Sequence, residues 1–166
     1  MKVERLCEKI TPWCGDTTFY CVPFTEIQEA LRDNCPEELF TIIMRRLMME
    51  IAQRICEKNG ITALITGESV GQVASQTMGA DAAQDLPILR PLIGMDKTEI
   101  IETSRHINTF ETSILPYEDC CTVFTPKHPK TKPILEEVIA AQNSFDFEPL
   151  IQKAVEETEV KRFNIC

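Results

Sequence analysis

The sequence lacks any long run of apolar residues. No stretch of the chain approaches the ~20 consecutive apolar positions that a membrane-spanning helix needs. The opening segment MKVERLCEKI also lacks the apolar core of a secretion signal. With 43% hydrophobic and 26% charged residues, the composition is typical of globular proteins. These features predict a soluble, cytoplasmic protein without membrane contact, and the length suits a single domain over residues 1–166.

A surplus of basic residues is also missing. The chain has 17 Lys and Arg against 26 Asp and Glu, a net charge of −9. Proteins that hold nucleic acid by themselves usually carry an excess of cations, because neutralising phosphates and releasing counterions supply much of the affinity. Any contact with RNA is therefore expected from a local patch, such as the KHPKTK run at 127–132, or from another domain.

The cysteines do not show the spacing of a metal site. None of the eight forms a CxxC pair, and the chain has only two histidines, so no metal site is predicted. Most of the cysteines fall in segments with helix or strand patterns, which favours reduced thiols over a disulfide framework.

Helical periodicity alternates with short apolar runs along the chain. Strands are predicted at 19–24, 61–66 and 86–93. Helices are predicted at 3–12, from a cap at Thr25, at 37–59, at 69–78, from a capping box at Asp96 and Glu99, at 133–145 and at 148–163. This order predicts an α/β fold in which helices cover a mostly parallel sheet and ligands bind beyond the carboxyl ends of the strands.

Polar residues stand where such a ligand would bind. Gly67, Glu68 and Ser69 follow the strand at 61–66, and the amide of Gln76 can both donate to and accept from a base. A tight strand-to-helix turn explains the same three residues without a ligand. Arg45 and its neighbour Arg46 interrupt an apolar helix, so one of them is expected to point inward or along a crevice and to meet a carboxylate, carbonyls or a phosphate. The alternative is an arginine whose aliphatic stem lies over the core.

Two adjacent thiols, Cys120 and Cys121, lie in a polar segment rich in turn-forming residues. The acids Glu118 and Asp119 oppose thiolate formation, whereas the cations of the 127–132 run favour it. The pair is therefore either a reactive site or buried filler, and the polar surroundings favour reactivity.

Five strings in this order resemble one family over about residues 3–160. They are TEIQ, MRRLM, LITGESVGQVASQT, PILRPLIGMDKTEII and PYEDCCTVFTPKHP. Together they are similar to the tRNA 4-thiouridine synthetases, also known as thiamine-biosynthesis tRNA sulfurtransferases.

The resemblance implies a fold, a reaction and a set of site residues. The fold would be an adenine-nucleotide α-hydrolase-like three-layer sandwich that uses ATP, with Mg²⁺ in the complete enzyme, to adenylate the uridine at position 8 of tRNA. Sulfur from a persulfide, supplied by a cysteine desulfurase, would then replace the activated oxygen, with a second branch toward the thiazole of thiamine. Matching positions assign ATP contacts to Arg45, Gly67 and Gln76, with Glu68 and Ser69 beside them. They assign catalysis to Cys120, with Cys121 as the second thiol.

The sequence departs from the family pattern in three places. The glycine-rich pyrophosphate loop is missing, since no two glycines are adjacent, and so is the N-terminal RNA-binding region. The segment between Gln76 and Pro87 is also short. We therefore expect a domain truncated at its N-terminus that is inactive alone and meets tRNA mainly through other segments. The sequence does not decide between a monomer and a homodimer. The alternative function is a non-catalytic nucleotide-binding or thiol-relay module.

Overall fold

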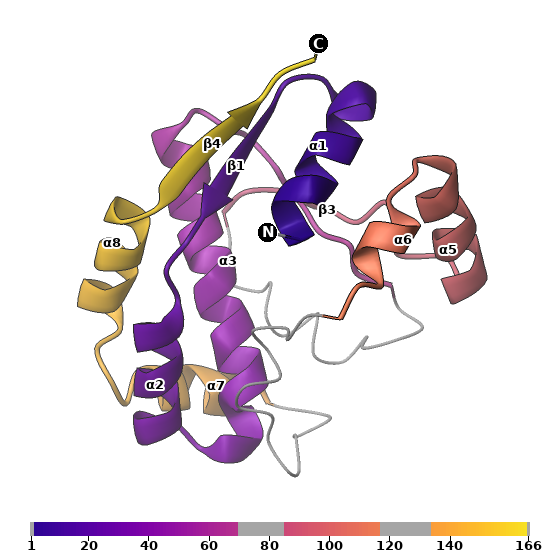
Figure 1. Cartoon of the computed structure of the whole chain (residues 1–166). Coiled ribbons are helices and arrows are strands. Elements are labelled where there is room, and N and C mark those ends of the chain that lie inside the picture. The colour runs from indigo at the N-terminus through magenta and orange to yellow at the C-terminus, as the bar shows by residue number, and fades with distance from the viewer. Residues whose placement is uncertain (1, 70–84, 117–133, 166) are drawn as a thin grey trace.

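The computed structural model describes residues 2–69, 85–116 and 134–165. The first half contains α1 (Lys2–Cys14), β1 (Thr17–Cys21), α2 (Thr25–Asn34), the 3-10 turn η1 (Glu37–Leu39) and α3 (Phe40–Lys58). The second half contains β2 (Leu64–Ile65), β3 (Ile88–Leu89), α5 (Lys97–His106), α6 (Phe110–Ser113), α7 (Leu135–Gln142), α8 (Glu148–Glu156) and β4 (Glu159–Phe163). The predicted α/β class is confirmed, and Figure 1 shows the arrangement.

The long helix α3 organises the core. Helices α2, α7 and α8 pack around it (Figure 1). Apolar residues recur every four positions on this helix at Ile43, Leu47 and Ile51, which are buried, and Ile43 and Leu47 have no exposed surface. Their partners on neighbouring helices include Leu31, Val138 and Ile151. Each such side chain contributes roughly 1.5–3 kcal/mol on leaving water, so this cluster accounts for much of the stability.

The carboxyl-terminal segment is not the single helix that we predicted for 148–163. Helix α8 ends at Glu156, and β4 then pairs antiparallel with β1, with Thr17 opposite Phe163 and Cys21 opposite Glu159. The local pattern of Glu and Lys favours a helix. Strand β1, near the other end of the chain, provides five residues with which this segment can form backbone hydrogen bonds instead. Tertiary pairing therefore overrides local propensity here.

The second sheet is the one that matches the predicted parallel arrangement. Strand β2 pairs parallel with β3, through hydrogen bonds of 2.9 Å from the Leu64 N–H to the Pro87 carbonyl and 3.0 Å from the Thr66 N–H to the Leu89 carbonyl. Within the described residues the two sheets are separate strand pairs, and β1–β4 is antiparallel. The prediction of a parallel sheet is therefore met only by β2 and β3.

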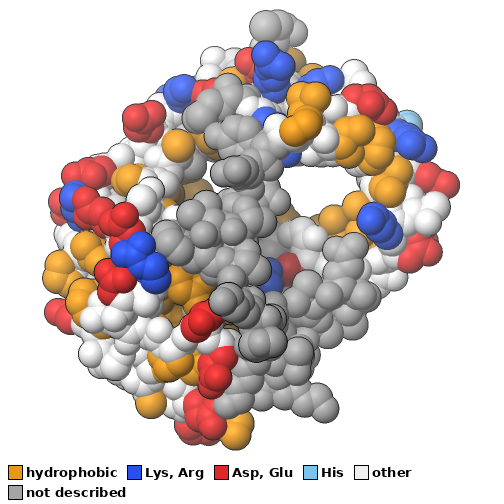
Figure 2. Space-filling model, turned by 60° about the horizontal axis from the view of Figure 1, so that its bottom comes forward, with side chains coloured by type: hydrophobic (Ala, Val, Ile, Leu, Met, Phe, Trp, Pro, Cys, Tyr) orange, Lys and Arg blue, Asp and Glu red, His pale blue; other side chains and the backbone are white. Residues whose placement is uncertain are grey.

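This second sheet leaves apolar surface uncovered. Ile65 is 70% exposed and Leu89 is 53% exposed. Figure 2 shows an opening through the molecule that is lined in part by hydrophobic side chains. Helix α5 likewise has no buried residue, although it carries Ile100 and Ile101. This side of the structure therefore packs less completely than the cluster around α3.

The helix ends follow the predicted signals in part. The capping box is confirmed: the Asp96 carboxylate accepts from the backbone of Thr98 and Glu99, and the Glu99 side chain accepts from the Asp96 N–H at 2.7 Å. Thr25 is not a cap but the first residue of α2. None of the helices in the described ranges combines the length and apolar character needed to cross a bilayer.

Replacing Leu47 with alanine should destabilise the fold strongly. The side chain is fully buried on α3, so Leu47→Ala should lower the free energy of unfolding by about 2–5 kcal/mol, through lost transfer free energy and a cavity. The adjacent Met48 is 38% exposed, and Met48→Ala should cost less than about 1 kcal/mol. Urea denaturation measures both values, and equal losses would contradict this account of the core.

Candidate functional site

The carboxyl ends of β2 and β3 lie at one edge of the parallel sheet. Residues 66–69 follow β2 and residues 90–95 follow β3, so two loops meet there. Helix α3 also contacts β2 and brings Arg45 to the same edge. In α/β proteins this edge is the usual place for a ligand, because the loops can vary while the strands fix their positions. We refer to Arg45, Thr66, Gly67, Glu68, Ser69 and Arg90 as the strand-end site.

Glu68 lies at the centre of the strand-end site. Its Oε1 accepts a hydrogen bond of 2.6 Å from Nη2 of Arg45. Its Oε2 accepts from Nε of Arg90 at 3.2 Å and from the Thr66 hydroxyl at 3.1 Å. The carboxylate thus joins groups from α3 and from the ends of both strands. Its side chain is 16% exposed, so these ion pairs are partly shielded from solvent.

Gly67 and Ser69, the neighbours of Glu68 in the loop after β2, contribute in different ways. A methyl group built on Gly67 would meet no atom of the described residues within 4 Å, and the backbone of Gly67 is not in the left-handed region. The glycine therefore leaves open space beside the sheet edge. The Ser69 hydroxyl donates to the Met95 carbonyl at 2.9 Å, which ties the loop after β2 to the loop after β3.

The two adjacent arginines of α3 separate as the sequence predicts. Arg46 is buried, with 7% exposed surface, and its Nε donates to the side-chain oxygen of Gln142 on α7 at 2.8 Å. Burial lowers the pKa of Arg46, although Glu50 opposes the shift. Arg45 is the one that reaches the strand-end site. An inward arginine with an oxygen partner is confirmed, and Arg46 has a structural role.

Arg90 and Thr66 are not among the site residues that the sequence predicts. Both follow directly on the short strands β3 and β2, and polar residues in that position mark the ligand-binding edge of a parallel sheet. That signal was available for both residues. The ion pairs that Glu68 forms could not be predicted from the sequence, because Glu68 lies 22 residues before Arg90 and 23 residues after Arg45.

Three predicted site residues lie outside the described residues. They are Gln76, Cys120 and Cys121, together with the basic run at 127–132. Their predicted roles therefore remain predictions. In the described ranges no group of three or more His, Cys, Asp and Glu side chains is placed to hold a metal ion.

The five described cysteines are free thiols. Desolvation is the main cause of a raised pKa at Cys7, Cys35 and Cys56, which makes these thiols poor nucleophiles at neutral pH. Near Cys7, the carboxylates of Glu4 and Glu8 raise the pKa further. Three of the described thiols are thus suited to packing and not to sulfur chemistry.

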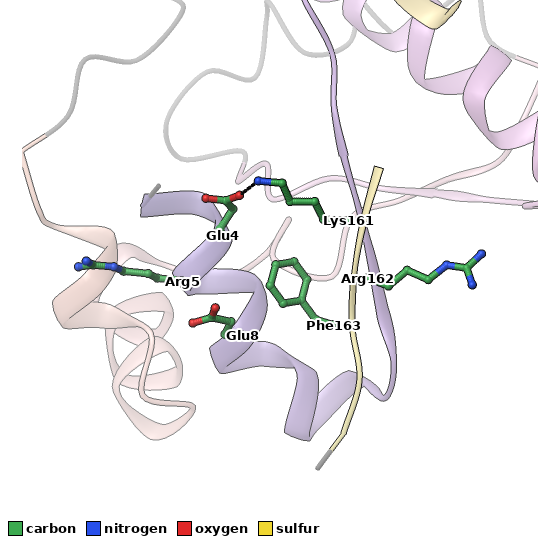
Figure 3. Close-up of a pocket in the computed structure, with 6 residues that line it drawn as sticks. All are labelled: Glu4, Arg5, Glu8, Lys161, Arg162 and Phe163. Carbon is green, nitrogen blue, oxygen red and sulfur yellow. Dashed lines mark hydrogen bonds and ion pairs between the residues drawn. The ribbon is translucent and has the colours of Figure 1, made fainter. Parts of the chain in front are cut away.

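A separate cavity lies between α1 and β4. It has a volume of about 610 Å³ and is lined by Glu4, Arg5, Glu8, Lys161, Arg162 and Phe163. Figure 3 shows the side chain of Glu4 reaching Lys161, whereas Arg5 and Arg162 point away in opposite directions. The lining charges therefore do not converge on one ligand, and none of these residues belongs to the strand-end site.

Comparisons with known proteins agree with this fold and place the chain in a family. A family model described as thiamine biosynthesis protein (ThiI) matches residues 1–147. Proteins named "Probable tRNA sulfurtransferase" from Acetivibrio thermocellus and Clostridium acetobutylicum are 54% and 53% identical over 163 residues, which cover 96% of this chain and 42% of each relative. A crystal structure of a 4-thiouridine synthetase in complex with RNA and bound ATP has a TM-score of 0.90 at 30% identity, over 98% of this chain and 44% of that one.

The parallel strand pair β2–β3 and the helices around it define the chain as part of an α/β protein. The chain belongs to the thiamine biosynthesis protein (ThiI) family. It spans about two fifths of the length of the curated relatives that it matches.

The ion pair beside the α1–β4 cavity can be tested by titration. Its hydrogen bond with Lys161 is the main cause that lowers the pKa of Glu4 from 4.5 to about 2. Because the folded-state pKa is lowered, the stabilisation is present above pH 4.5 and is lost as the pH falls through about 2. Carboxyl NMR should show a Glu4 midpoint near 2 that rises toward 4.5 in Lys161→Met. Lys153→Met, which breaks a pair with Glu26, is the control, and an unchanged midpoint in Lys161→Met would contradict the assignment.

Proposed function

We propose that the full-length protein containing this chain is an ATP-dependent tRNA sulfurtransferase that makes 4-thiouridine. In this reaction the uridine at position 8 is adenylated, and sulfur from a persulfide then replaces the activated oxygen. The observation that carries the proposal is the similarity, over 98% of this chain, to the 4-thiouridine synthetase crystallised with RNA and ATP. The names of the close relatives support the same reaction class. Sulfur transfer toward the thiazole of thiamine is the further branch that we propose.

The strand-end site supports the nucleotide part of this function. A guanidinium group has five N–H donors, and Arg45 directs one of them to Glu68 with no other partner among the described residues. Its remaining donors suit phosphate or ring nitrogen acceptors. The open space above Gly67 would let a ligand approach the backbone closely. Gln76 completes the proposed ATP contacts, with Mg²⁺ bound in the complete protein.

We also propose that the β1–β4 pair and the β2–β3 pair belong to one larger sheet in the full-length protein. The exposure of Ile65 and Leu89, and the absence of any buried residue in α5, support further packing on this side. The segment with the pyrophosphate loop would complete a three-layer sandwich, of which residues 1–166 form one part. This chain alone is then expected to adenylate RNA poorly or not at all.

The remaining roles are assigned to segments and partners outside the described residues. Cys120 is the proposed catalytic thiol, with Cys121 as the alternative or resolving thiol. A cysteine desulfurase is the proposed sulfur donor, because the thiolate must receive sulfur by an exchange reaction. Capture of tRNA is assigned mainly to the N-terminal region of the full-length protein, in agreement with the net charge of −9.

Loss of the Cys120 thiol should abolish thiouridine formation without affecting the fold. Full-length Cys120→Ala should leave no 4-thiouridine in tRNA from cells that carry only this variant, as measured by mass spectrometry of nucleosides. The matched control is Cys14→Ala, because Cys14 is an exposed thiol on α1. Normal thiouridine in Cys120→Ala cells would remove this residue from the mechanism. Persulfide on Cys120 without ATP consumption would favour the thiol-relay alternative.

The space above Gly67 gives a test of nucleotide binding. Gly67→Ala should change the free energy of unfolding by less than about 0.5 kcal/mol, because the new methyl group meets no neighbour in the described part of the chain. The same methyl group should weaken ATP binding at least about tenfold, or about 1.4 kcal/mol, by preventing close approach to the backbone. Calorimetric titration of the full-length protein measures the affinity. An unchanged affinity would show that the ligand does not use this space.

A further inference from the structure

We infer that Glu68 is a positioning residue that holds Arg45 in place for the nucleotide, and that Arg90 and Thr66 hold Glu68. This inference rests on the proposed function, because it assumes that Arg45 contacts ATP. It gives Glu68 a role different from direct ATP contact. It also brings Arg90 and Thr66 into the strand-end site.

The hydrogen bonds around Glu68 argue against direct contact with the phosphates. A carboxylate can only accept hydrogen bonds, and three donors from Arg45, Thr66 and Arg90 already occupy its two oxygens. Phosphate oxygens are acceptors with negative charge, so they would be repelled by the Glu68 carboxylate. The phosphates of the nucleotide are therefore expected to meet the arginine and not the carboxylate.

Anchoring explains what the network provides to Arg45. A free arginine side chain samples many rotamers, and fixing it on binding lowers the affinity by the entropy lost. The 2.6 Å contact with Glu68 fixes one edge of the guanidinium before the nucleotide arrives. The side chains of Arg45 and Arg90 are 28% and 25% exposed, so the ion pairs lie partly out of solvent, where they hold their geometry better than a surface pair.

Three separate elements must meet for this anchoring to work. Arg45 comes from α3, Thr66 and Glu68 follow β2, and Arg90 follows β3. The charges at the centre are two cations and one anion, so the network has a net charge of +1 that is suited to a polyanionic ligand. The same arrangement links the orientation of Arg45 to the pairing of the two strands.

The test is a double-mutant cycle on ATP affinity in the full-length protein. Glu68→Gln should weaken ATP binding about tenfold or more, because the charge that orients Arg45 is lost. Arg45→Ala should weaken binding at least as much. In the Arg45→Ala background, Glu68→Gln should then change the affinity less than about twofold, because a positioning residue has nothing left to position. Calorimetric titration measures all four affinities.

A control variant separates this effect from the loss of any carboxylate that pairs with an arginine of α3. Glu50 also forms an ion pair of 2.7 Å with an arginine of α3, Arg54, and its side chain is 33% exposed, compared with 16% for Glu68. Glu50→Gln should leave ATP affinity within about twofold of the unaltered protein. If Glu68→Gln does not fold, the milder Thr66→Val removes only one donor to Oε2 and should weaken binding about twofold to fivefold, again only when Arg45 is present.

The outcomes distinguish this inference from the proposed function. No ATP binding by the unaltered full-length protein would contradict the proposed function. ATP binding that is weakened by Arg45→Ala but not by Glu68→Gln or Thr66→Val would overturn the positioning role alone. Losses that multiply in the double variant would also overturn it, because they would show that Glu68 acts on the nucleotide independently of Arg45.

Discussion

Burial of one face of α3 is the interaction on which the rest of the structure depends. The helix brings Ile43, Met44 and Leu47 into full contact with α2, α7 and α8. Once that face is buried, the position of every other side chain on the helix is fixed by the helical geometry. Arg46 then points into the interface with α7, and Arg45 points toward the ends of β2 and β3. The packing of the core thus decides which arginine can serve a ligand.

The strand-end site combines rigid and open features. Its charged residues are held by ion pairs among α3, β2 and β3, whereas Gly67 contributes space beside them. A preorganised cation next to accessible backbone suits a nucleotide, because little has to move on binding. The incomplete packing around β2, β3 and α5 agrees with a protein in which further segments contribute to the same sheet.

Much of the local structure was readable from the sequence because it depends on neighbours along the chain. Local patterns of this kind are the apolar repeat of α3, the capping box at Asp96 and Glu99, and the apolar runs that form β2 and β3. The strand β4 was not readable, since its partner β1 lies at the opposite end of the chain. The role of Glu68 was hidden for the same reason, because both arginines lie more than 20 residues away in sequence.

A crystal structure of the full-length protein with ATP would test the central claim most directly. The account predicts that the guanidinium of Arg45 lies within about 3.2 Å of an acceptor on the nucleotide, with the nucleotide beside Gly67 and with Glu68 still bound to Arg45. A nucleotide bound elsewhere, for example in the cavity between α1 and β4, would contradict it.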